Sequence, residues 1–368
     1  MRKKTGFQKT GKEGGEFYSA PTTFKEMTGM YGITENGIGL YSENRFDKAY
    51  ICTENAGNVF VSNAEKVKGC TRVLRDTNVK FCFYEISEIE EHTLLLISIF
   101  IKELSDAERA FANFEKEIQE KGNTFGITIK GLTAEEKLSL FHRLIMADSS
   151  GAKTNVTQYL AKTSGWLLDF ELRHCQEKDR CLITGKVHSN VMYIRRIPAE
   201  YASVIYRTLK RTECCRMLVT TYEPVSEQEV MSQIQNNYMG FDSLLYKLKR
   251  KKVGIGKIAE EKPERRYLYA GIYFVLSCKD SNRLQEEKEK LQNILRKYGS
   301  EAAEYCFYQK EALQKLSFLN PWVVQQMRLI QIQSAAGMNP FYQDEKELAE
   351  DEMDEKSELL AAFDSIIS

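Results

Sequence analysis

The pattern of apolar and polar positions predicts strands that alternate with one-sided helices, most clearly between Val191 and Val225. The pattern predicts one strand over 191–197 and a second over 217–222. Pro198 ends the first strand, because proline has no N–H for a sheet ladder and suits the first turn of a helix. The predicted helix between the strands has one apolar stripe, made of Tyr201, Ile205 and Leu209.

The same rhythm continues on both sides of this unit. Further strands are predicted at 48–53, 79–86, 94–104, 125–129, 267–278 and 304–308, and strands or a hairpin at 181–188. Capping boxes, in which Ser or Thr precedes Glu by three positions, open three predicted helices at Ser105–Glu108, Thr133–Glu136 and Ser226–Glu229. The first of these helices is expected to end at Gly122. Asp280 is expected to cap another helix, which Gly299 closes.

An internal repeat relates residues 94–141 to residues 268–319. Both segments are predicted as a long strand, a capped amphipathic helix, a glycine, a short strand and a second helix, and Lys137-Leu-Ser-Leu-Phe141 parallels Lys315-Leu-Ser-Phe-Leu319. Because a helix with one apolar face must cover a sheet, each lobe is expected to be a two-layer sandwich. The predicted fold class is therefore α+β or α/β, with two related lobes of mixed sheet layered with amphipathic helices.

These elements divide the chain into four parts. Residues 1–30, which are rich in Lys and Gly, are expected to form a flexible basic tail, and residues 343–368 an acidic C-terminal tail. Between the tails we expect a first α/β lobe over 31–150 and a second over 151–342. The boundary lies in a Ser-, Gly- and Ala-rich segment at 148–154.

Composition and charge narrow the function classes. Lys and Arg total 52, as do Asp and Glu, so no overall field attracts nucleic acid or acidic lipid. The nine cysteines lack the spacing of a disulfide framework, which indicates reduced thiols in a cytosolic compartment. The most apolar run, Leu94–Ile101, is far shorter than the roughly 20 residues that span a bilayer. We therefore expect a soluble cytoplasmic protein that reaches a membrane only through a partner.

Phosphate-binding motifs are the first candidate chemistry. Gly6–Glu13 resembles a Walker A loop, but Glu13 replaces the Ser or Thr that holds magnesium, and no strand precedes the loop. A solvated tail is the favoured interpretation. A second candidate is the basic run Lys247, Lys249, Arg250, Lys251 and Lys252, which could neutralise nucleic-acid phosphates. The run has no interleaved aromatic residues for base stacking, so a solvated helix end is the favoured alternative.

Metal-ligand residue types gather in one stretch, at His174, Cys175, Cys181 and His188. The five residues between the two cysteines miss the usual zinc-ligand spacing, so separate reduced cysteines on strands are the favoured interpretation. We assign no catalytic, cofactor-binding or metal residue. An enzyme built on this stretch is the third and weakest function class.

Several ordered segments resemble the N-terminal, non-motor half of the conjugation and type IV secretion ATPases, the CagE/TrbE/VirB family. They are Gly32–Thr53, Ala107–Gly122, Leu132–Leu144, Arg195–Pro198, Thr220–Val225, Phe318–Pro321 and Ser334–Phe341. In the family a P-loop motor follows, whereas here acid-rich sequence follows Phe341. ATP hydrolysis and its catalytic residues are therefore not carried over, and the chain is expected to be either an excised or split half or a motor-less relative.

The resemblance implies a non-catalytic docking and assembly protein. Its partners would be membrane channel components of a type IV secretion or conjugation system, neighbouring subunits including further copies of the chain, and a separate ATPase motor. It would act at the cytoplasmic face of a bacterial membrane, needs no cofactor, and belongs with mobile genetic elements. The alternative from the residues is a nucleic-acid-binding α/β protein of plasmid or mobile-element processing, in which the basic run lies in a charged groove.

Overall fold

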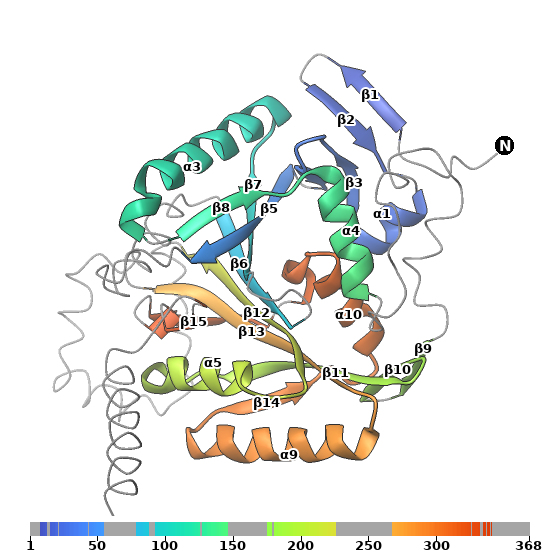
Figure 1. Cartoon of the computed structure of the whole chain (residues 1–368), viewed down its shortest axis with the longest axis vertical. Coiled ribbons are helices and arrows are strands. Elements are labelled where there is room, and N and C mark those ends of the chain that lie inside the picture. The colour runs from blue at the N-terminus through green and yellow to red at the C-terminus, as the bar shows by residue number, and fades with distance from the viewer. Residues whose placement is uncertain are drawn as a thin grey trace, which may run out of the picture.

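The computed structural model describes residues 8–54, 79–87, 93–145, 175–225 and 267–340, except 13–14, 21, 43, 126, 179, 325, 332–333, 336 and 339. Its strands form one 15-stranded sheet, in which each pairing between described strands is antiparallel (Figure 1). The mixed α+β class with helices layered on a sheet is confirmed, while the expected mixture of parallel and antiparallel pairs is not found among these strands.

Two halves of the sheet repeat one topology. The first half contains β5 (Arg45–Glu54), β6 (Val79–Ile86), β7 (Thr93–Phe100), α3 (Leu104–Phe125), β8 (Ile127–Gly131) and α4 (Ala134–Ile145). The second contains β11 (Val187–Arg196), α5 (Ala202–Lys210), β12 (Cys215–Pro224), β13 (Tyr267–Cys278), α9 (Ser281–Lys297), β14 (Glu301–Glu304) and α10 (Gln309–Ser317). The strand orders, β8-β5-β7-β6 and β14-β11-β13-β12, correspond strand for strand.

The second half follows the ferredoxin-like β-α-β-β-α-β order, from β11 through α5, β12, β13 and α9 to β14. The first half has the same strand order; residues 55–78, which follow β5 in the chain where α5 follows β11, lie outside the described part. The repeat predicted for 94–141 and 268–319 is confirmed as β7-α3-β8-α4 and β13-α9-β14-α10. The matching Lys-Leu-Ser sequences are not equivalent, because Lys137 lies in the first turn of α4 and Lys315 in the last turn of α10.

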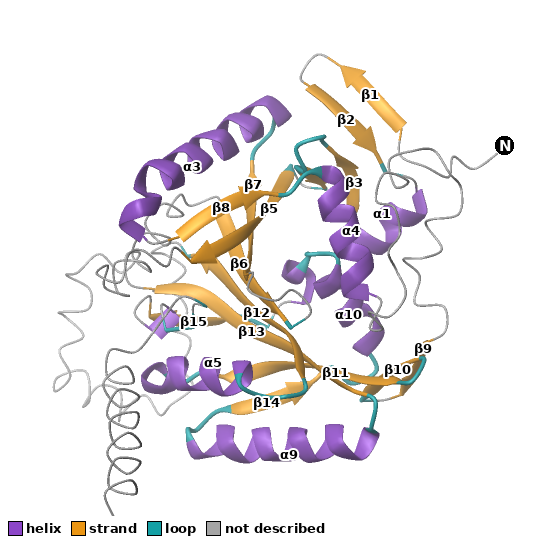
Figure 2. Ribbon diagram, in the orientation of Figure 1, coloured by secondary structure: helices purple, strands orange, loops and turns teal. Residues whose placement is uncertain are grey.

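The two halves join edge to edge through β6 and β12, whose register runs from Phe81↔Tyr222 to Ile86↔Met217. Both hydrophobic cores therefore contain residues from both halves. One core, under α3, α5 and α9, includes Phe111, Ile205 and Leu291. The other lies under α4, α10 and α1 (Thr22–Thr28) and includes Phe141, Leu316 and Phe24. Helices thus cover both faces of the sheet, giving three layers where two were expected (Figure 2).

Shorter strands extend the sheet at its two ends. At one end lie β1 (Gln8–Lys12), β2 (Gly15–Ser19), β3 (Met30–Ile33) and β4 (Gly39–Tyr41); at the other lie β10 (Cys181–Thr184) and β9 (Cys175–Lys178). β15 (Arg328–Gln331) pairs with β13. Two 3-10 helices complete the described elements: η3 (Ala199–Tyr201) precedes α5, and η5 (Pro321–Val324) precedes β15. Residues 8–30 were expected within a flexible tail; instead β1, β2 and α1 form there, and Phe24 is completely buried.

Several helix ends follow from local chemistry. The Asp280 carboxylate accepts the Asn282 N–H at 2.8 Å, and Gly299 at φ +66° follows the end of α9, both as expected. Thr133 and Glu136 form the predicted reciprocal capping box. α3 differs from its prediction, since it starts at Leu104 and continues through Gly122 to Phe125.

Candidate functional site

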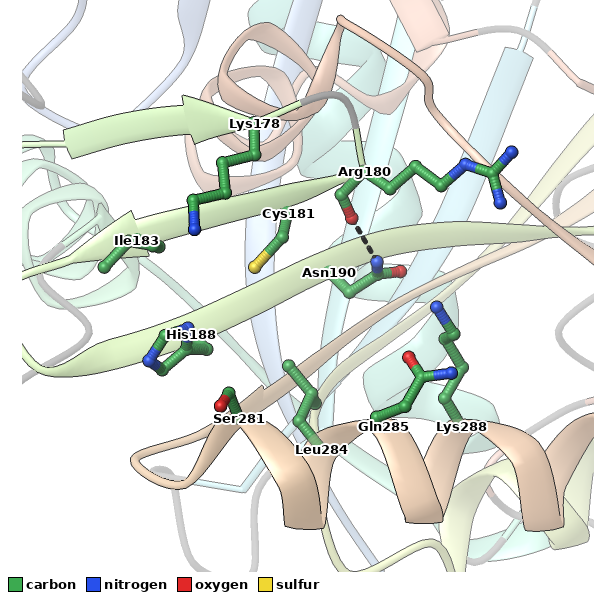
Figure 3. A pocket seen from close by; sticks show the side chains of 10 residues that line it. All are labelled: Lys178, Arg180, Cys181, Ile183, His188, Asn190, Ser281, Leu284, Gln285 and Lys288. Atoms are coloured by element: carbon green, nitrogen blue, oxygen red, sulfur yellow. Dashed lines mark hydrogen bonds between the residues drawn. The ribbon is translucent and has the colours of Figure 1, made fainter.

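A cleft of about 430 Å³ lies between the β9–β10–β11 end of the sheet and the first turns of α9 (Figure 3). A tight turn joins the two strands on one side of it: Thr184 pairs with Val187, so only Gly185 and Lys186 connect β10 to β11. Gly185 has φ +60°, as such two-residue hairpin turns require. The resulting register places Ile183 opposite His188, and both line the cleft together with residues of α9. We call this the β9–α9 cleft.

Three cations line the β9–α9 cleft: Lys178, Arg180 and Lys288. Lys288 Nζ lies 2.7 Å from Glu304 Oε1, and Arg180 Nε lies 4.0 Å from Glu304 Oε2. The Lys288–Glu304 pair is largely buried, with side chains only 14% and 9% exposed. Three positive charges beside one carboxylate leave the cleft cationic, and its walls suit an anionic group better than a cation.

Asn190 supplies a buried polar group to the same cleft. Asn190 is 3% exposed, and its Nδ2 donates to the Arg180 carbonyl oxygen, which fixes the side-chain amide (Figure 3). Its Oδ1 has no hydrogen-bond partner among the described residues. A buried acceptor is normally satisfied, so this oxygen is placed to accept a hydrogen bond from a water molecule or a ligand donor.

Cys181 also faces the β9–α9 cleft, and burial raises the pKa of its thiol. The Ser189 backbone N–H and the positive charges of Lys178 and Lys288 oppose the rise without cancelling it, while Glu304 adds to it. The thiol is therefore protonated at neutral pH. Since the thiolate is the reactive form, the arrangement does not activate Cys181 as a nucleophile.

The structure separates the metal-like stretch considered from the sequence. Cys181 and His188 line the β9–α9 cleft, but Cys175 pairs with Thr184 and packs against the core on the opposite face of the sheet. His174 lies outside the described residues. Within the described ranges no group of three or more His, Cys, Asp or Glu residues is arranged to hold a metal ion. The β9–β10 register separates the two cysteines: Cys181 is opposite Lys178, and Cys175, three positions before Lys178, faces the other side of the sheet.

The basic run Lys247, Lys249, Arg250, Lys251 and Lys252 lies outside the described residues, so its groove stays a prediction. A salt-dependent DNA-binding assay with these charges removed tests it, because lost phosphate contacts weaken binding and reduce its salt dependence.

A second surface feature is the corner between β14 and α10. Phe307 there is 77% exposed and has φ +55°. Tyr305 and Tyr308, which are close to it in sequence, belong to a group of three aromatic rings, with Tyr193 and Tyr305 centroids 4.9 Å apart and Tyr305 and Tyr308 centroids 6.3 Å apart. The sequence pattern predicted a strand over 304–308, whereas β14 covers Glu301–Glu304 and a turn follows. The prediction was wrong because aromatic residues are common in strands, so the aromatic run was taken for one.

Among the helices of the described residues, none is both long and apolar enough to cross a membrane. No family model matches the chain, and no curated protein matches it. A solved structure that it resembles is that of CrmK, a flavoenzyme involved in shunt product recycling in caerulomycin biosynthesis, at 12% sequence identity and a TM-score of 0.29. That match covers 69% of this chain and 42% of the CrmK chain, and so spans less than half of that protein.

Proposed function

We propose that this chain is a non-catalytic docking and assembly module of a conjugative-transfer, or type IV secretion, machine. The proposal rests on the sequence resemblance to the non-motor half of the transfer ATPases and on one structural observation, the exposed Phe307 corner. The partners are a separate ATPase motor and membrane channel components, which hold the module at the cytoplasmic face of the membrane.

Phe307 is unfavourable for the stability of its own chain in two ways. A left-handed backbone costs a residue with a Cβ about 1–2 kcal/mol. The ring, 77% exposed, recovers little of the free energy that burial of an aromatic side chain supplies. Leu319 also has a positive φ, of 52°, but its side chain is completely buried and contributes to the core. Burial of Phe307 against another protein would recover what its own fold leaves unused.

The residues that follow Phe307 are fixed to the sheet by hydrogen bonds. Tyr308 leads directly into α10, and the Lys310 backbone N–H donates to Glu177 Oε1 of β9 at 3.0 Å. The side-chain amide of Gln309, at the start of α10, is bonded to the Val191 backbone. Rigid aromatic anchors dominate many protein interfaces, because little conformational entropy is lost when they bind.

The test is a titration of the purified chain with the ATPase motor and, separately, with the cytoplasmic parts of the channel components of the same transfer system. Phe307→Asn removes the ring and keeps a residue that tolerates positive φ. We expect it to weaken binding of one of these partners about 30-fold, the loss typical of an interface anchor of about 2 kcal/mol. Calorimetry measures the affinity.

The matched control is Ile294→Asn on α9, where the native side chain is 38% exposed. It should leave the affinity unchanged. Phe307→Asn should also unfold at no lower urea concentration than the native chain, because Asn relieves backbone strain. If the native chain bound none of the components of the system, the proposal would be overturned. If both variants bound as tightly as the native chain, Phe307 would not be part of the docking surface.

A further inference from the structure

Two cysteines line a second, smaller cleft of about 230 Å³, which shares no lining residue with the β9–α9 cleft and does not include Phe307. Cys214 precedes β12, and Cys278 is the last residue of β13. The Ser277 N–H donates to the Cys214 carbonyl oxygen at 2.8 Å, which extends the β12–β13 ladder to the cysteine pair. Both cysteines, together with Cys215, line this cysteine cleft.

The backbone contact and the shared cleft bring the two side chains together. Burial raises the pKa of the Cys214 thiol to about 11, and Cys278, which is hydrogen-bonded to that thiol through its own side chain, adds to the rise. Glu287 raises the pKa further and Arg283 lowers it. A disulfide requires a backbone that holds the two cysteines close, and Cys278 directly follows Ser277, whose N–H bonds the Cys214 carbonyl oxygen.

Cys215 differs from this pair although it is adjacent in sequence. Its Sγ donates to the Met217 carbonyl oxygen at 3.7 Å, and burial, with Glu85 adding to it, raises the pKa of its thiol to about 12. It is therefore held by its own backbone and protonated. Among the cysteines that line the cleft, Cys215 and Cys278 are both half-buried, while Cys214 is only 7% exposed. Because the Cys215 thiol is bonded to its own backbone, Cys278 is the half-buried cysteine that a reagent entering the cleft is expected to meet first.

We propose that Cys214 and Cys278 are a redox-active pair that reacts with low-molecular-weight disulfides, such as glutathione disulfide, to form an intramolecular disulfide. The Cys278 thiolate attacks one sulfur of the reagent, breaks its S–S bond and releases the first thiol. The Cys214 thiol, which is protonated until then, loses its proton to the first released thiolate, attacks Cys278 Sγ, forms the Cys214–Cys278 bond and releases the second thiol; its position beside Cys278, not a lowered pKa, allows this step. The two protons lost by the cysteines are taken up by the two released thiolates, so the chain is oxidised by two electrons and the reagent is reduced.

The new bond would link the residue before β12 to the end of β13, two strands at the centre of the sheet. A cross-link restricts the unfolded chain more than the folded one, so the oxidised protein should resist thermal unfolding better than the reduced protein. The state of the pair would thus set the stability of the β12–β13 ladder, independently of whether the docking proposal holds.

The experiment incubates the reduced full chain with glutathione disulfide under native conditions, blocks free thiols, and maps peptides by mass spectrometry. We expect one Cys214–Cys278 linked peptide, an intact mass lower by two hydrogen atoms, a higher Tm, and full reversal by dithiothreitol. Cys214→Ser and Cys278→Ser should abolish the linked peptide, whereas Cys215→Ser and Cys306→Ser should retain it.

The native chain alone suffices to overturn the proposal, so a variant that fails to fold does not obscure the result. A persistent glutathione adduct on Cys278, a cross-link that uses Cys215, or unmodified Cys214 and Cys278 after incubation would each contradict a reactive pair.

Discussion

The two halves of the sheet hold the helix that follows their fourth strand in different ways. In the first half, Lys137 of α4 reaches Asp47 of β5 with a 2.6 Å Nζ–Oδ1 contact, and both side chains are completely buried. In the second, Gln309 of α10 accepts the Val191 N–H of β11 at 2.6 Å through Oε1 and donates to the Val191 carbonyl oxygen at 3.1 Å. One half uses a buried ion pair where the other uses a neutral amide.

The difference shows what each solution demands of its surroundings. A buried charge must keep its partner, because desolvation is expensive and only close pairing offsets it. The first half therefore leaves space around the pair: a Cβ added at Gly39 would lie 2.5 Å from Asp47 Oδ1 and 3.0 Å from Lys137 Nζ. Asp47 also adds to the rise that burial causes in the pKa of Tyr41. The amide of Gln309 needs no such charged setting, since it bonds only backbone groups.

Breaking the ion pair from one side should have the largest effect. Asp47→Ala leaves the Lys137 ammonium buried without its carboxylate, and we expect a loss of about 3–5 kcal/mol in the free energy of unfolding. Urea denaturation followed by circular dichroism measures it. Replacing both partners with apolar residues, as Asp47→Val with Lys137→Met, should recover most of the loss. A double variant as unstable as the single one would mean that the pair supplies specific stabilisation that apolar packing cannot replace.

Breaking the amide contact should cost less. Gln309→Leu keeps the volume near that of the native side chain but leaves the Val191 N–H unpaired and its carbonyl oxygen with only the long 3.4 Å bond from the Tyr305 N–H, so we expect a loss of about 1–3 kcal/mol by the same measurement. Gln314→Leu, a half-buried position on the same helix, is the matched control and should change the stability much less. If Gln309→Leu were as costly as Asp47→Ala, the contrast between charged and neutral solutions would not hold.

The N-terminal ends of α4 and α10 also differ, and changing them should have the smallest effect on stability. α4 opens with the Thr133–Glu136 capping box, whereas Tyr308, at the N-cap of α10, makes no side-chain capping bond. Hydrogen bonds from Lys130 and then from the Thr133 backbone lower the pKa of Glu136. Because a lowered pKa stabilises the folded state only while the group is ionised, this contribution is present above the ordinary glutamate pKa and lost as pH falls through the lowered value.

Glu136→Gln should therefore destabilise the chain by only about 0.5 kcal/mol at neutral pH, since the site is largely exposed and screened by solvent. The difference from the native chain should shrink as pH falls below the ordinary glutamate pKa. Urea midpoints measured from neutral to acidic pH test this, and a difference that grows on acidification would contradict it.

Local patterns predicted the long elements but not the short ones. The run from Tyr267 to Cys278 is apolar enough to be recognised as a strand and is β13 without a change of bounds. β1 and β2 have no such pattern; they form because they pair with each other and because β2 pairs with β3. Phe24 alone in α1 gave little sign that residues 8–30 join the core. At the β9–α9 cleft, Cys181 and His188 were noticed in the sequence, while Lys288 and Glu304 were not, because they come from elements about a hundred residues away along the chain.

By itself, the sequence determined the class of the fold, the duplicated strand-and-helix order, and the helix ends at Asp280, Gly299 and Thr133, because each depends on residues a few positions apart. Only the tertiary structure decided that β6 meets β12, that helices cover both faces, and that Cys214 lies against Cys278. Strand partners are chosen by the fit of whole surfaces that are distant in sequence, and no local pattern records that choice.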